Sequence, residues 1–405
     1  MSDDLLVNNL RQQFPFFAAE PLCYLDSAAT AQLPQCVLDA LQDFEIHRRG
    51  NVGRGSHRQA DRAMEAYHKA RLQVRDYLHA DSEREVIFTA GTTAAINAFA
   101  DSVASTFSAG DEIVLSQLEH HSNLLPWRRA AQKYQLTIRI IEADSDGRLA
   151  LSQLPQLMNA RTRLIAVTHA SNVTGAITDV AAIVAAAKTV SAMVMLDGAQ
   201  MAAHGPLDVQ ALGVDAYVFS GHKCYGPNGI GVLWGRESLL ASLPPFAVGG
   251  GMVGRIDEQG FECLSLPARL EAGTPAIAQA VGLGAALGWL SDLDWPAIER
   301  YQRQLLNRLI SVLIAIPGLQ LLGPNNDQQR LGLLSFALKG CHPHDLCHVL
   351  AEQGVAVRGG HLCAQPLLAA SGHQTVTRIS LGLYNNQTDV EQLIAALAHA
   401  RRVLL

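Results

Sequence analysis

The feature that most constrains this chain is a repeated alternation of short apolar runs with longer helical patterns. Seven runs rich in Val, Ile, Leu and Phe predict strands at 85–89, 112–116, 137–141, 163–169, 192–197, 216–220 and 230–235. Between most of them stand helical patterns, at 93–107, 124–134 and 179–190. Strands that alternate with helices need crossover connections, which give a parallel sheet. We therefore expect an α/β fold with a doubly wound, mainly parallel seven-stranded sheet.

The pattern changes near Leu293, where strict alternation stops. A long amphipathic helix is followed by a strand at LGLLSFAL, a helix near DLCHVLAEQG, a strand at VAVRGG and a terminal helix at DVEQLIAALAHARRVLL. This order indicates a smaller α+β C-terminal domain. We predict a large domain over residues 16–292 and a small domain made of residues 1–15 and 293–405.

Composition and charge exclude several classes of protein. With 405 residues, 49% hydrophobic content and a net charge of −6, the chain can bury a large core and has no basic stripe for nucleic acid. The N-terminal sequence lacks the pattern of a secretion signal, and no apolar run reaches membrane-spanning length. We expect a cytoplasmic protein that binds neither nucleic acid nor membranes. The seven cysteines lack framework spacing and are expected to be reduced thiols.

Unusual polar residues follow the ends of the predicted strands. Ligands of open α/β sheets bind in the crevice beyond the carboxyl ends of the strands, so residues in these positions are expected to form one site. The candidates are Thr92, Thr93, His120, Asn172, Asp197, Gln200, Ser220, His222 and Lys223.

Three of these positions together suggest a cofactor. In AGTTAAIN, Gly91 and the hydroxyls of Thr92 and Thr93 precede a helix N-terminus, which can bind phosphate, although the segment alone is more typical of an ordinary helix cap. Asp197 is either a turn residue or a buried anion that holds a cation. Lys223 stands in the glycine-rich turn SGHKCYGPNGIG, where burial would lower its pKa. A phosphate seat, a carboxylate and a free amine are the groups that pyridoxal phosphate needs.

Histidine and arginine candidates add chemistry to this site. Of the adjacent pair His120 and His121, at most one can lie over a cofactor ring, and we favour His120, whose neutral imidazole could also move protons. Arg378 lies in the strand pattern TVTRISLG, where its planar fork could pair with a substrate carboxylate. From this residue alone, a structural ion pair is the simpler interpretation.

Cys363 is the candidate nucleophile among the cysteines. It follows VAVRGGH in what is expected to be a glycine-flexible loop, with Arg358 and His361 close enough in sequence to favour a thiolate. The other six cysteines stand mainly in apolar or helical contexts, where a small buried side chain suffices. The segment CHPHDLCH offers ligand types for zinc but not the spacing, and it is better explained as the turn and cap of a helix. We therefore predict no metal.

A family resemblance covers nearly the whole chain, from YLDSAATAQLP to the terminal helix. In order along the sequence, VIFTAGTTAAIN, LEHHSNLLPW, SNVTGA, LDGAQ, SGHKCYGPNGIG, EAGTP and VRGGHLCAQP resemble motifs of the class V aminotransferase group. This group belongs to the fold-type I pyridoxal-phosphate enzymes. Within it, the chain is most similar to the group II cysteine desulfurases of the SufS and CsdA kind.

The resemblance implies a role for each matching residue. Lys223 is similar to the Schiff-base lysine, His120 to the imidazole stacked on the cofactor ring, and Asp197 to the partner of the pyridinium nitrogen. The other cofactor groups that it implies are Gln200 near the phenolic oxygen, the phosphate ligands Thr92, Ser220 and His222, and Thr274, which crosses a dimer interface. The groups that it implies for the substrate carboxylate are Asn172 and Arg378, with Arg358 nearby.

The resemblance also implies an activity. A cysteine desulfurase converts L-cysteine to L-alanine, leaves a persulfide on the residue matching Cys363, and passes the sulfur to an acceptor protein of the SufE/CsdE kind for uses such as iron–sulfur cluster assembly. A lyase that cleaves the C–S bond of cysteine or cystine, and a selenocysteine lyase, remain alternatives. Two departures bear on the substrate contacts and on the electrostatics of the cysteine loop, because group II relatives often carry histidine where this chain has Gly53 and Leu362.

Overall fold

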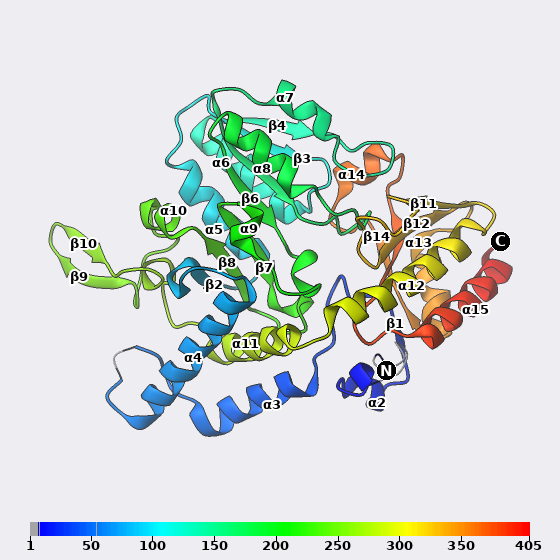
Figure 1. Ribbon diagram of the computed structural model, residues 1–405, viewed down its shortest axis with the longest axis horizontal. Coiled ribbons are helices and arrows are strands. Elements are labelled where there is room, and N and C mark those ends of the chain that lie inside the picture. The colour runs from blue at the N-terminus through cyan, green and yellow to red at the C-terminus, as the bar shows by residue number, and fades with distance from the viewer. Residues whose placement is uncertain (1–6, 8, 54) are drawn as a thin grey trace.

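The computed structural model describes residues 7, 9–53 and 55–405, and its centre is a seven-stranded sheet (Figure 1). The strands lie in the order β2-β8-β7-β6-β5-β3-β4, and β8 runs in the opposite direction to the other six. Their bounds are β2 Val86–Thr89, β3 Glu112–Ser116, β4 Thr137–Ile141, β5 Thr162–Thr168, β6 Met193–Asp197, β7 Ala216–Ser220 and β8 Gly231–Gly235. The predicted mainly parallel seven-stranded sheet is confirmed, with boundaries close to the apolar runs.

Helices cover both faces of this sheet, as the doubly wound prediction requires. Successive residues of a strand point to opposite faces, so Ile87 packs with α5 and α6 while Val86 and Phe88 pack with α4, α8 and α11. The longer helices of this part are α3 Gln35–Asp43, α4 Arg58–Tyr77, α5 Thr92–Ala104, α6 Leu125–Tyr134, α8 Val180–Thr189 and α11 Ile277–Ser291. The shorter ones are α2 Phe16–Ala19, α7 Leu154–Leu157, α9 Val209–Leu212 and α10 Glu237–Ser242.

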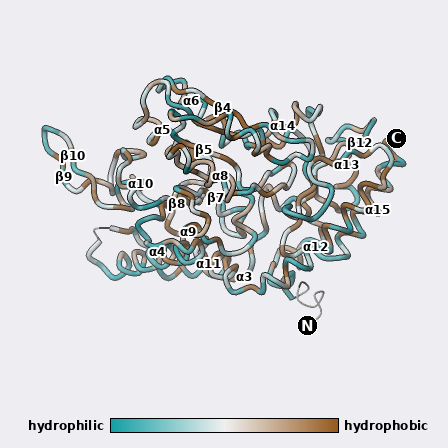
Figure 2. The backbone as a smooth tube through the Cα atoms, turned by 45° about the horizontal axis from the view of Figure 1, so that its top comes forward, coloured by the Kyte–Doolittle hydropathy of each residue, from teal (hydrophilic) through white to brown (hydrophobic). Residues whose placement is uncertain are grey.

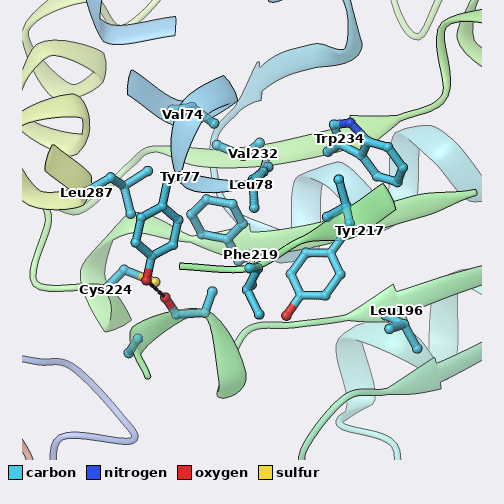
Figure 3. Close-up of a cluster of buried hydrophobic side chains, with 14 of the residues drawn as sticks. Val74, Tyr77, Leu78, Leu196, Tyr217, Phe219, Cys224, Val232, Trp234 and Leu287 are labelled. Atoms are coloured by element: carbon cyan, nitrogen blue, oxygen red, sulfur yellow. Dashed lines mark hydrogen bonds between the residues drawn. The ribbon is translucent and has the colours of Figure 1, made fainter. Parts of the chain in front are cut away.

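Large side chains fill the layer between the sheet and α4 (Figure 3). Each fully buried Phe, Leu or Val contributes about 1.5–3 kcal/mol relative to an exposed one, so this layer fixes the end of the sheet that carries β7 and β8. The labelled members of the layer are Val74, Tyr77, Leu78, Leu196, Tyr217, Phe219, Cys224, Val232, Trp234 and Leu287. The buried Tyr77 hydroxyl donates to Ala202 O at 2.7 Å, which satisfies its polar group.

The C-terminal part forms a smaller antiparallel sheet with the order β11-β12-β15-β14. Its strands are β11 Leu319–Leu322, β12 Leu333–Leu338, β14 Arg358–Gly360 and β15 Val376–Ser380. Its helices are α12 Trp295–Ile314, α13 Pro343–Glu352, α14 Gln365–Ala370 and α15 Gln387–Leu404. The predicted α+β character is confirmed.

An early segment of the chain joins this C-terminal sheet. Strand β1, Cys23–Tyr24, pairs in parallel with β13, Val355–Ala356, and Asp26 forms a bridge with Ser380. The domain division at 16–292 and at 1–15 with 293–405 stays a prediction, and residues 1–6 and 8 of it lie outside the described residues.

The sequence did not predict an exposed hairpin of β9, Val253–Asp257, and β10, Gly260–Cys263. Its residues are mostly exposed on both faces, so they lack the apolar alternation of a half-buried strand. The hairpin projects from the body of the molecule (Figures 1 and 2). No helix within residues 7, 9–53 and 55–405 has the length and apolarity needed to cross a bilayer.

A buried ion pair anchors the segment EAGTP, and its loss is expected to destabilise the fold. Glu271 accepts from Arg71 Nη1 and Nη2 at 2.8 Å each, from Tyr67 Oη at 3.0 Å and from Phe88 N at 2.6 Å. Glu271→Gln leaves the Arg71 charge without its partner, and we expect the free energy of unfolding to fall by about 3 kcal/mol. Urea denaturation measures this change in the free energy of unfolding, and Glu262→Gln, which alters an exposed carboxylate, is the control. An unchanged midpoint for Glu271→Gln would contradict this role.

Candidate active site

A cavity of about 530 Å³ opens at the carboxyl ends of the parallel strands, where the small sheet faces the large one. Both parts of the chain line it, which is the position expected for a ligand site of this fold. The sequence-predicted residues that line it are Thr92, Thr93, His120, Asn172, Asp197, Gln200, Ser220, His222, Lys223, Arg358, Cys363 and Arg378. The fold thus brings together side chains from seven separated segments.

One end of the cavity is built to hold an anion. Gly91, with a φ of +123°, turns the chain from β2 into α5, and the amide of Thr92 donates to Ser220 Oγ at 2.8 Å. The hydroxyls of Thr92 and Ser220 are 2.7 Å apart, and Thr93 Oγ1 lies 2.7 Å from Ser122 Oγ. Hydroxyls and a helix N-terminus converge here, which is the chemistry of a phosphate seat.

Asp197 supplies a buried negative charge at the end of β6. Its carboxylate is nearly inaccessible, with 4% of the residue exposed, and Oδ1 accepts from Ala199 N at 3.0 Å. Burial raises its pKa, while the Ala199 amide and the Lys223 charge act in the opposite direction. A cation placed against Asp197 would relieve the cost of its burial, so the site favours a ligand with a positively charged group at this position.

Lys223 lies in the tight turn that follows β7. Cys224 N and Gly226 N both donate to Gly221 O at 2.9 Å, and a Cβ on Gly221 would come within 2.8 Å of Ile230 Cγ2. Burial lowers the pKa of Lys223, Arg378 adds to this effect, and Asp197 opposes it. A lower pKa raises the fraction of free amine near neutral pH, as a nucleophilic lysine requires.

His120 enters the cavity as a neutral imidazole. Burial, followed by the nearby Lys223 charge, lowers its pKa to about 3. Its Nδ1 accepts from Ser122 N at 3.1 Å, so the proton of the neutral ring is on Nε2. His222 is also neutral, because burial lowers its pKa to about 4, and its Nδ1 lies 3.1 Å from Thr30 Oγ1.

Two hydrogen bonds hold the segment of Cys363 against the large domain, and a third lies within the segment. His121 N donates to Cys363 O at 2.7 Å, and Asn172 Nδ2 donates to Leu362 O at 2.8 Å. Cys363 N donates to His361 Nδ1 at 3.0 Å. Cys363 is partly exposed in the cavity wall. The thiol that the sequence selected is therefore placed in the same cavity as Lys223.

The two glycines before Cys363, which were expected to make this loop flexible, have different structural surroundings. Gly359 and Gly360 belong to β14, and a Cβ on Gly359 would meet Cys347 Sγ at 2.9 Å and Pro343 O at 3.0 Å. Gly359 is needed for close packing against α13, whereas Gly360, with a φ of +135°, permits the turn out of the strand. Leu362 is buried, with 7% exposed, which further fixes the segment.

Arginines occupy the small-domain wall of the cavity. Arg378 of β15 is almost fully buried, and its Nη1 donates to Asn172 O at 3.1 Å. Burial lowers its pKa to about 10, which still leaves the guanidinium charged at neutral pH. Asn172 therefore joins Arg378 to the Cys363 segment, since its side chain binds Leu362 and its carbonyl binds Arg378.

Some contributors to the site were not identified from the sequence. Asp26 bridges Arg358 and Arg378, Thr30 contacts His222, and His121 has the anchoring role described above although the sequence favoured only His120. His344 also lines the cavity. Asp26 stands in YLDSAAT, which carried the family resemblance, but the two-residue strand before it gave no pattern that could place its side chain.

Other predicted features lie outside this cavity. Thr274 and Gly53 line a second hollow of about 810 Å³, near the exposed hairpin.

Within the described part of the chain, no three His, Cys, Asp or Glu side chains gather as metal ligands would. In CHPHDLCH, His342 caps α13 and its Nδ1 accepts from His344 N at 3.3 Å, as the cap interpretation predicted. All seven cysteines are unpaired.

Comparison with protein families gives a match to Aminotransferase class-V over residues 23–393. A cysteine desulfurase of Dickeya dadantii is 41% identical over 404 residues, which cover 98% of this chain and 97% of that protein. A probable cysteine desulfurase of Pseudomonas aeruginosa is 44% identical over 391 residues, which cover 96% of each chain. These similarities include both parts of the fold.

Solved structures of cysteine desulfurases are also similar to this chain over nearly its whole length. The crystal structure of the cysteine desulfurase CsdA (S-sulfonic acid) from Escherichia coli has a TM-score of 0.92 and 39% identity, and the match covers 98% of this chain and 99% of that one. The apo structure of a cysteine desulfurase from Thermococcus onnurineus NA1 has a TM-score of 0.93 and 34% identity, with 98% of each chain covered.

Proposed function

The chain belongs to the aminotransferase class-V family, among its cysteine desulfurases, and from that premise we propose that it uses pyridoxal phosphate to convert L-cysteine to L-alanine. The sulfur passes to Cys363. The observation that carries this proposal is the presence of Lys223 and Cys363 in one cavity that also holds a buried carboxylate and an anion seat. Lys223 alone would fit many pyridoxal-phosphate enzymes, whereas a transaminase needs no thiol at this position.

The residues of the cavity fit the cofactor. Thr92, Ser220 and the start of α5 would hold the phosphate, Asp197 the ring nitrogen, and Lys223 the aldehyde carbon. When bound, pyridoxal phosphate supplies a carbonyl that condenses with the substrate amine and a ring that accepts an electron pair. Gln200 is fixed by donating from Nε2 to Ala28 O at 3.0 Å, which supports its placement beside the ring.

In this proposal, the arginines of the cavity wall hold the substrate, and the Cys363 thiol approaches it. Arg378 would bind the α-carboxylate, while the amide of Asn172 keeps the Cys363 segment against the same side of the cavity. Lys223 Nζ and His120 Nε2 are the groups that can move protons at the α and β carbons. Burial lowers the pKa of Lys223, so its free amine can act as a base near neutral pH, whereas the neutral His120 ring carries a proton on Nε2 that it can donate.

The transfer step balances without an added oxidant. The Cys363 thiolate attacks the substrate sulfur, so an S–S bond forms as the C–S bond breaks. The electron pair of the C–S bond stays with the carbon, which takes up one proton to become the methyl group of alanine, and this proton balances the one that the Cys363 thiol lost. The enzyme is left with a persulfide. We propose that a sulfur-acceptor protein of the SufE/CsdE kind then takes this sulfur in the cytoplasm, for uses such as iron–sulfur cluster assembly.

Product analysis tests the proposed function. Purified protein supplied with pyridoxal phosphate, L-cysteine and a thiol acceptor is expected to form alanine and sulfide in equal amounts. Pyruvate in place of alanine would show a C–S lyase instead. A strong preference for L-selenocysteine, with little turnover of L-cysteine, would show a selenocysteine lyase.

We also propose a homodimer in which Thr274 reaches the phosphate of the partner's cofactor. Thr274 lies outside the cavity of its own chain, in the hollow near the exposed hairpin, which supports a role across an interface. Thr274→Ala is expected to raise cofactor loss during dialysis about tenfold, equal to about 1.4 kcal/mol of binding. Thr189→Ala, whose hydroxyl bonds only to its own helix, is the control. A protein that sediments as a monomer and still has full activity would contradict the composite site.

A further inference from the structure

Asp26 connects two arginines of the cavity wall with unequal strength. Arg358 Nε lies 3.1 Å from both Asp26 oxygens, and Arg358 Nη2 lies 2.7 Å from Oδ2. Arg378 Nη2 makes a single, longer contact of 3.3 Å with Oδ1. A carboxylate with three contacts to one guanidinium and one to the other neutralises mainly the first. Arg358 thus forms an ion pair with Asp26, while most of the positive charge of Arg378 remains available to bind a ligand.

The sheet makes a counterion necessary at this point. Arg358 of β14 and Arg378 of β15 are directly opposite in the antiparallel register, and like charges placed so repel each other. Burial of Arg378, of whose side chain 3% is exposed, increases the repulsion because it removes solvent screening. Asp26 brings a negative charge between them, so the three side chains carry a net charge of about +1.

The Asp26 backbone is held independently of its carboxylate. Asp26 forms a parallel bridge with Ser380, Ser380 N donates to Leu25 O at 2.8 Å, and Ala28 N donates to Ser380 Oγ at 2.9 Å. The side chain therefore acts on the arginines from a fixed position. Exchanging its charge for an amide should leave the fold and the cofactor groups in place.

Arg378 retains hydrogens for a carboxylate. Its Nη1 gives one hydrogen to Asn172 O and its Nη2 gives one to Asp26, so each terminal nitrogen has a second hydrogen for a bidentate partner. Arg358 and Cys363 line the same cavity from one continuous segment, residues 358–363. A substrate whose carboxylate binds Arg378 and whose sulfur points toward Cys363 therefore has its side chain against the wall that carries Arg358.

We infer that Asp26 is a positioning and specificity residue, which orients Arg378 for one α-carboxylate and cancels the charge of Arg358 beside the substrate side chain. The wild-type cavity then accepts a neutral thiol side chain and disfavours an acidic one. This inference rests on the proposed function, because it assumes that L-cysteine binds with its carboxylate at Arg378.

Asp26→Asn in the holoenzyme tests the inference. The KM for L-cysteine is expected to rise about tenfold with kcat within about twofold, because Arg378 loses its orientation while Lys223 and Cys363 are untouched. Inhibition by L-aspartate relative to L-alanine is expected to strengthen about tenfold, since the freed Arg358 charge attracts a second carboxylate. The ratio of the two inhibition constants cancels any general loss of active protein. Asp39→Asn, an exposed carboxylate on α3, is the control.

A double variant tests whether restoring the net charge of the cavity wall also restores the selectivity against L-aspartate. Asp26→Asn with Arg358→Gln restores a net charge of about +1, and the L-aspartate to L-alanine ratio should return toward the parent value. An unchanged ratio in Asp26→Asn, or an unchanged KM, would overturn the inference, and so would a failure of the double variant to restore the ratio. If the single variant does not fold, the double variant and Arg358→Gln alone are compared with the parent. If the parent itself does not turn over L-cysteine, the proposed function fails instead.

Discussion

Lys223→Ala is expected to lower alanine formation from L-cysteine by about a thousandfold, in line with the loss of a general base and covalent anchor. The cofactor should still bind, because the anion seat at Thr92 and Ser220 and the carboxylate of Asp197 do not depend on the lysine. Borohydride treatment of the parent should fix the cofactor to Lys223, identified by mass spectrometry of the digest. The variant should yield no such adduct while retaining noncovalent cofactor.

The control for this experiment is Lys188→Ala, an exposed lysine near the end of α8. It should leave the adduct and the rate unchanged. A parent adduct on another lysine, or a Lys223→Ala enzyme with near-parental turnover, would contradict the assignment of the buried turn after β7.

Cys363→Ser is expected to separate binding from sulfur transfer. The serine hydroxyl keeps the size of the side chain, and the backbone bonds of the segment to His121 and His361 remain. Cofactor content and the spectral change on adding L-cysteine should therefore match the parent. Alanine formation should fall by about a hundredfold or more, equal to at least about 2.7 kcal/mol of barrier, because no thiolate can accept the sulfur.

Cys36→Ser on α3 is the matched control, because it removes an exposed thiol that does not line the cavity. Release of sulfur by Cys363→Ser at the parental rate would exclude Cys363 as the acceptor. Pyruvate as the accompanying product would then favour the lyase alternative.

Much of the large domain could be predicted from the sequence because its strands are buried on both faces. Runs such as EIVLS and AYVFS are mainly apolar and are buried throughout, and the strand ends of this sheet place Thr92, Asp197 and Lys223 in one cavity. The hairpin β9–β10 and the strand β11 were not predicted, because their exposed residues interrupt the apolar pattern. A continuous apolar run therefore made a strand recognisable, and the partly exposed β4 was recognised because TIRII is still rich in isoleucine.

The site could be predicted only where local sequence carries the chemistry. Lys223 and Cys363 stand in distinctive turns, whereas the effect of Asp26 depends on two arginines more than three hundred residues away in the chain. The glycine pair before Cys363 suggested flexibility, but only the packing against Cys347 and Pro343 shows why Gly359 is required. Long-range contacts of this kind leave no local pattern.

A single-turnover experiment tests the central claim most directly. The holoenzyme is mixed with L-cysteine without an acceptor, quenched and digested, and the peptide that contains Cys363 is examined by mass spectrometry beside an assay of the small products. The account predicts one additional sulfur atom on Cys363 and an equal amount of alanine. An unmodified Cys363 together with free sulfide and pyruvate would contradict it.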